Sequence, residues 1–155
     1  MNDLELCTYS GDPKIHGNWA VPLLAIGWLE AGHNFETGPV EQGVVDKVRK
    51  LHEQTWQKFI AFSYRGLHEC DLCASGSATR GIDGSHTNTF VPGDNCVYMA
   101  SGGILHYIEK HSYLPPLEFI DAVRDSPLPS TQEYAEALIE ANQGERPLLL
   151  GPMTT

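Results

Sequence analysis

Two cysteines three positions apart, followed further along the chain by two histidines five positions apart, constrain this sequence more than any other feature. Cys70 and Cys73 form a CxxC pair, and His106 and His111 form an HxxxxH pair. Two thiolates and two imidazoles are a ligand set that suits a tetrahedral zinc ion. The sequence therefore predicts a structural metal site with the ligands Cys70, Cys73, His106 and His111, and Zn²⁺ as the cofactor.

The segment between the two pairs predicts a β-hairpin and a short helix. The runs 88–91 and 96–99 are rich in β-forming residues and flank a Pro-Gly-Asp-Asn turn at 92–95. A helix over 104–111 then carries both histidines. A cysteine knuckle, a hairpin and a helix with the second ligand pair follow one another as in treble-clef zinc cores. We therefore expect an α+β fold with a small treble-clef-like core packed against several helices.

The spacing of the histidines restricts how this helix can end. Residues five apart on an ideal α-helix point about 140° away from each other. Both rings can reach one ion only if His111 lies at or beyond the last turn. The run Tyr113-Leu114-Pro115-Pro116 breaks the helix at this place.

Other elements are expected on both sides of the ligand segment. An apolar stripe of Val44, Val48 and Leu51 predicts a helix over about 40–58. The expected elements besides this helix are a strand or helical turn within 20–29, a strand over 59–64, a helix from Pro116 onward, and a last helix begun by a Ser130–Glu133 capping box and ended by Gly144. We expect one zinc-binding domain over 1–145 and a flexible C-terminal tail over 146–155.

Charge and hydropathy restrict the partners and the location. The chain has 155 residues and a formal net charge of -10 at pH 7. An acidic surface repels phosphate backbones and anionic lipids, so we expect no nucleic-acid or membrane binding. The N-terminal residues are acidic rather than basic, unlike a secretory signal, and no apolar run is long enough to span a membrane. These features predict a cytoplasmic protein with reduced thiols.

Alternatives remain for the ligands and for the chemistry. His68, His86 and Cys96 compete with the four predicted residues for a place around the ion, and Cys7 is expected to be a free thiol. A zinc-dependent hydrolase with an open metal position near His68 and His86 is the alternative function. A thiol redox protein that uses the CxxC pair is a third reading, although no helix pattern follows Cys73.

The chain also resembles a family of small uncharacterised bacterial proteins. Its Gly66-Leu67-His68-Glu69-Cys70-Asp71-Leu72-Cys73 run matches a GxHxCxxC element, and residues 106–119 match HYIxxHxYxPPxxF. The resemblance covers about residues 25–125. It implies the same metal ligands and a bacterial cytosolic setting, and it carries no activity.

No catalytic constellation is assembled in the sequence, so enzymatic activity is left open and no catalytic residue is assigned. We expect the protein to act by binding another protein. Trp19, Trp28 or Trp56 could anchor such a partner where they are exposed, but burial in the core is the simpler expectation for a large aromatic side chain.

Overall fold

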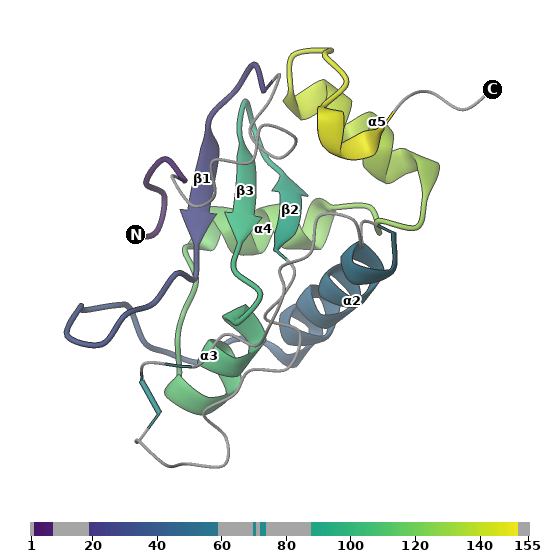
Figure 1. Cartoon of the computed structure of the whole chain (residues 1–155). Helices are drawn as coiled ribbons and strands as arrows, with labels where there is room; N and C mark the ends of the chain where they lie inside the picture. The colour runs from purple at the N-terminus through teal and green to yellow at the C-terminus, as the bar shows by residue number, and fades with distance from the viewer. Residues whose placement is uncertain (1, 8–18, 59–69, 71, 74–87, 152–155) are drawn as a thin grey trace.

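The computed structural model describes residues 2–7, 19–58, 70, 72–73 and 88–151 of the chain. These residues form a mixed α+β structure with four α-helices and a three-stranded sheet (Figure 1). The strand predicted over 59–64 lies outside the described residues. The elements are β1 (Leu23–Ile26), α2 (Gln42–Lys58), β2 (Thr89–Pro92), β3 (Val97–Ala100), α3 (Ile104–His111), α4 (Leu117–Asp125), α5 (Gln132–Ala141) and a 3₁₀ helix (Leu148–Leu150).

The sheet combines the predicted hairpin with a strand from near the N-terminus. Its order is β1-β3-β2, with β2 antiparallel and β1 parallel to β3. The hairpin prediction is confirmed, with strands shifted by one residue, and the ambiguous run within 20–29 contains a strand. A parallel pair needs a long crossover. The connection from β1 to β3 contains α2, which packs against β2 and shares a core with one face of the sheet.

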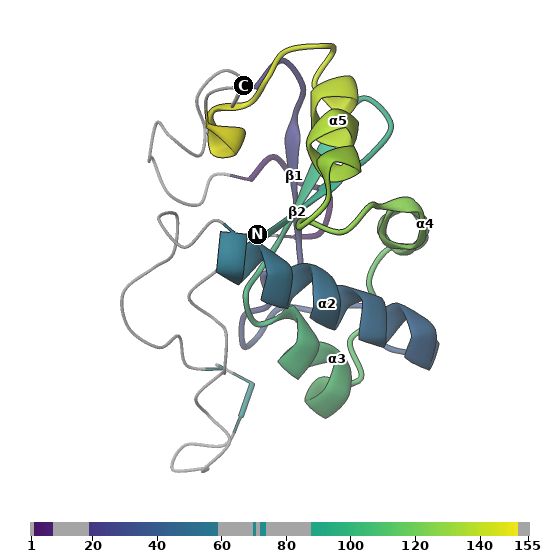
Figure 2. The ribbon, with the colours of Figure 1, turned by 90° about the vertical axis from the view of Figure 1, so that its right-hand side faces the viewer.

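The two faces of the sheet bury different parts of the chain. Along β3, Tyr98 and Ala100 belong to the core shared with α2, α3 and α4, whereas Val97 and Met99 belong to the core shared with α5. This alternation follows from the two-residue period of a strand. Figure 2 shows α2 and α3 side by side below the sheet, with α5 at its upper end.

Helix α2 confirms the predicted helix and begins two residues later than expected. Its apolar stripe is buried, with Val48 2% and Leu51 0% exposed. Thr55 lies one turn after Leu51, and its hydroxyl donates a hydrogen bond to the Leu51 carbonyl over 2.6 Å. On the outer side, Arg49 pairs with Glu109 of α3 at 2.9 Å. The buried stripe packs α2 against α3, and the exposed ion pair adds a polar contact between the two helices.

The predicted last helix forms as α5, but the prediction that a Ser130–Glu133 capping box begins it is wrong. The residue before α5 is Thr131, not Ser130, and no side chain caps the helix. The Thr131 hydroxyl donates instead to the Leu128 carbonyl over 2.7 Å, so the residue stabilises the preceding turn. Gly144, at φ 84°, follows the helix, and its amide donates to the Ile139 carbonyl over 2.8 Å.

The C-terminal segment contacts the core at least as far as the 3₁₀ helix. Leu149 is buried in the core that α5 shares with the sheet. The Arg146 guanidinium donates to the Gly151 carbonyl over 2.7 Å. The division into a domain over 1–145 and a tail over 146–155 stays a prediction. Within the described part of the chain, no helix has both the length and the apolar character needed to cross a bilayer.

Candidate metal centre

The two cysteines and two histidines that the sequence singled out lie together in space. Each of the four offers one ligand atom, and these atoms all lie within 4.8 Å of one another. The Nε2 atom of His111 lies 3.4 Å from the Cys70 sulfur and 3.5 Å from the Cys73 sulfur. The Nε2 atom of His106 lies 3.3 Å from the Cys73 sulfur. Such a group is close enough to bind a metal ion.

The end of α3 brings two histidines five residues apart to the same place. Ser112, directly after the helix, is in the left-handed conformation with φ 54° and ψ 26°, and its amide donates to the Tyr107 carbonyl. This hydrogen bond spans five residues rather than four, which widens the last turn in the manner of a π-turn. The ring centroids of His106 and His111 are consequently 5.2 Å apart.

The cysteine pair is held by a tight turn that is packed into the core. The Cys73 amide donates to the Cys70 carbonyl over 3.3 Å, which closes the turn between the two thiols. Cys70 is 0% exposed and belongs to the core of α2, α3 and α4, and Leu72 packs against that core. Burial of these side chains therefore fixes the position of the thiols relative to α3.

The segment that follows α3 is tied to the N-terminal part of the chain. Tyr113 is fully buried, and its hydroxyl donates to Asp3 Oδ2 over 2.6 Å. Asp3 Oδ1 accepts the Gly27 amide over 2.9 Å. The backbone next to Tyr113 also pairs with residues 36–38. The Leu114 amide donates to the Glu36 backbone carbonyl, and the Gly38 amide donates to the Ser112 backbone carbonyl. His111 thus lies just before a firmly anchored segment.

Burial shifts the pKa values of two cluster residues, Cys70 and His106, toward their neutral forms. Burial raises the pKa of the Cys70 thiol, and backbone hydrogen bonds in the turn offset part of this increase. Burial also lowers the pKa of the His106 imidazole, and His111 and Lys110 lower it further. A neutral imidazole is the form that binds metals, whereas the thiols must lose protons to do so.

Comparison with known proteins identifies a family but no activity. A family described as a domain of unknown function, DUF7919, matches residues 1–124. The chain belongs to this family. No curated protein and no solved structure matches the chain. The match contains all four residues of the cluster and ends at α4, so α5 follows the DUF7919 match. The expected relation to an uncharacterised family is confirmed, and the particular motif stays a prediction.

The remaining cysteines of this DUF7919 domain, Cys96 and Cys7, lie outside the cluster. Cys96 is buried in the same core as Cys70 but does not belong to the four-residue cluster, so it does not compete for that place. Cys7 is also buried, and its thiol contacts the Met99 sulfur at 3.4 Å. His68 and His86 lie outside the described residues.

Sequence reasoning missed the residues that support the cluster from outside. Asp3 gives no signal in the sequence, because a lone carboxylate near a chain start is usually solvated. Its partner Tyr113 stands out in the sequence only as part of a helix-breaking run. The contact between them spans 110 residues, and only the folded chain reveals it.

Proposed function

We propose that Cys70, Cys73, His106 and His111 bind one structural zinc ion. The observation that supports this proposal is the set of sulfur–nitrogen distances of 3.3, 3.4 and 3.5 Å. With a zinc–sulfur distance of about 2.3 Å and a zinc–nitrogen distance of about 2.0 Å, the sulfur–nitrogen edge of a tetrahedron measures about 3.5 Å. Three of the four sulfur–nitrogen separations already match this edge, and all four ligand atoms lie within 4.8 Å of one another.

Direct hydrogen bonds between thiols and imidazoles are a weaker explanation of the same distances. One such bond would account for a single cysteine–histidine pair. Here the Nε2 atom of His111 faces both sulfurs, and Cys73 faces both imidazoles. Convergence of four ligand atoms on one point favours a central ion, and the mixed sulfur and nitrogen donors favour zinc over harder cations.

The proposed zinc acts as a structural staple rather than as a catalyst. Four protein ligands complete a tetrahedral shell and leave no position for water or substrate. The ion would join the cysteine turn to α3 across the intervening β2–β3 hairpin. This order of knuckle, hairpin and helix supports a treble-clef-like core, and burial of Cys70 supports a role in stability.

The activity that we propose for the DUF7919 domain is binding of another protein, in a bacterial cytosol. A net charge of -10 argues against nucleic acid and anionic membranes as partners. Trp19, Trp28 and Trp56 are all partly exposed, which makes them candidate anchors for a partner. Affinity capture from a native bacterial lysate should return a stoichiometric protein, and repeated capture of none would contradict this part of the proposal.

Metal analysis of the purified chain tests the zinc proposal directly. We expect one zinc ion per chain in protein purified without added metal, and loss of zinc in Cys73→Ser and His106→Ala. Cys96→Ala is the matched control, because it removes a buried thiol of the same core that lies outside the cluster. Wild-type protein without metal, or full zinc content in Cys73→Ser and His106→Ala, would refute the ligand assignment. If the protein contained iron instead, the four ligands would stand and the identification of the metal as zinc would be wrong.

A further inference from the structure

A second candidate site lies between the N-terminal segment and the loop after β1. It is a pocket of about 270 Å³. Two aromatic side chains, Trp28 and Phe35, and three carboxylates, Asp3, Glu30 and Glu36, line it. Pockets for drug-sized ligands measure about 300–1,000 Å³, so this one suits a small molecule or a single side chain.

Three of the residues that line this pocket, Asp3, Trp28 and Phe35, are held in place by the fold. The Trp28 indole donates to the Met99 carbonyl over 3.0 Å, which attaches its ring to β3. Phe35 packs edge-on against Tyr113, with ring centroids 6.1 Å apart. Asp3 is held by the Tyr113 hydroxyl and the Gly27 amide. Because these groups are positioned by the fold, a ligand would lose little free energy in ordering them.

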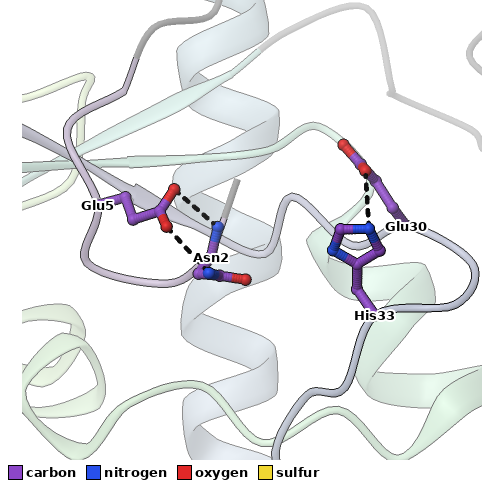
Figure 3. A network of polar contacts seen from close by, with 4 residues as sticks. All are labelled: Asn2, Glu5, Glu30 and His33. Atoms are coloured by element: carbon purple, nitrogen blue, oxygen red, sulfur yellow. Dashed lines mark hydrogen bonds and ion pairs between the residues drawn. The ribbon is translucent and has the colours of Figure 1, made fainter.

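The charge of the pocket is negative. Among the described residues that line the pocket there is no lysine or arginine, and the one basic side chain is His33, 3.8 Å from Glu30. Figure 3 shows the Glu30 carboxylate facing the His33 ring, while the Glu5 carboxylate on the opposite segment is turned toward Asn2. Glu36 is exposed, and among the described residues no side chain pairs with its carboxylate. The carboxylate of Glu36 is therefore available to a ligand.

We propose that this pocket binds an alkylammonium group. Aromatic side chains attract organic cations through their ring faces, and the carboxylates add charge attraction. An anion would be repelled by three carboxylates, and a neutral apolar ligand would remove water from them without compensation. The group could belong to a free amine or to a lysine side chain of a partner protein. The proposal is independent of the proposed metal.

Titration of the full chain as purified tests the proposal, with the Trp28 indole N–H resonance as the readout. The probes are n-butylammonium, tetramethylammonium and N-acetyl-lysine-amide, and n-pentanol is the neutral control of similar size. We expect n-butylammonium, tetramethylammonium or both to shift the Trp28 resonance saturably. The alcohol should bind about tenfold more weakly than these free ammonium ions. Binding of the capped lysine as well as the free amines indicates a side-chain site, and binding of the free amines alone indicates a small-molecule site.

A matched pair of charge variants separates the pocket from the general acidity of the protein. Glu36→Gln removes one carboxylate of the pocket, and Glu53→Gln removes one exposed carboxylate of α2 outside it. We expect about three- to tenfold weaker amine binding in Glu36→Gln and no change in Glu53→Gln. Equal effects of the two variants, an alcohol that binds as tightly as the amines, or no shift with any probe would overturn the proposal.

Discussion

Zinc should stabilise the folded chain by an amount set by the ratio of free zinc to Kd, because the ligand cluster is complete only in the folded state. Each sulfur–nitrogen contact joins residues 33 to 41 positions apart in the sequence, so the complete ligand set exists only in the native fold. An ion that binds only the folded state adds about 1.4 kcal/mol to the free energy of unfolding for each tenfold rise in free zinc above Kd. At 100 times Kd the gain is about 2.7 kcal/mol.

Urea unfolding in a series of zinc buffers measures this slope. The thiols are kept reduced, and unfolding is followed by far-ultraviolet circular dichroism at constant pH. Cys73→Ser should abolish the dependence on zinc. Cys96→Ala should lower the free energy of unfolding at every zinc concentration, because it removes a buried sulfur, and should keep the slope. Since the thiols release protons on binding, the apparent zinc affinity should fall as the pH is lowered.

The result that would refute this reasoning is a free energy of unfolding that does not change with free zinc while the protein still contains the metal. That outcome would place the ion where the fold does not depend on it. A slope near 2.7 kcal/mol per tenfold change would instead indicate two ions per chain, which a single Cys₂His₂ cluster cannot hold. Full dependence on zinc in Cys73→Ser would show that other ligands bind the ion.

Three further predictions concern the anchor after α3 and the core beneath α5. Tyr113→Phe should lower the free energy of unfolding in urea by roughly 1.5–3 kcal/mol, because the hydroxyl donates to the charged Asp3 carboxylate. Burial raises the pKa of Tyr113 and Tyr134, so the folded state holds these protons more tightly. The stabilisation from this effect is complete below about pH 10. Above it, the free energy of unfolding should fall by about 1.4 kcal/mol per pH unit for each tyrosine. Tyr134→Phe should make this decrease with pH less steep in urea titrations. Leu138→Ala, in the fully buried face of α5, should cost roughly 2–5 kcal/mol in a single unfolding transition, and an uncooperative loss of α5 alone would argue against one domain.

Local patterns were sufficient for most of the helices and for the hairpin. The stripe of Val44, Val48 and Leu51 predicts α2 because a helix repeats every 3.6 residues and one face must be buried. Turn chemistry at 92–95 located β2 and β3 to within one residue. The capping box failed because Ser130 and Thr131 both precede α5 and both can cap a helix. The Thr131 hydroxyl donates instead to the Leu128 carbonyl three residues earlier, and this local hydrogen bond competes with capping of the helix.

The sequence by itself determined the four cluster residues. Thiols and imidazoles are few in this chain, and their CxxC and HxxxxH spacings restrict how they can be used. Only the tertiary structure decided how His106 and His111 meet, because the wide last turn of α3 depends on the left-handed Ser112 and on the anchored Tyr113. It also decided the carboxylate and aromatic pocket, since Asp3 and Trp28 are distant in sequence and carry no shared pattern. Contacts of this kind arise from the packing of separate segments, which local sequence does not encode.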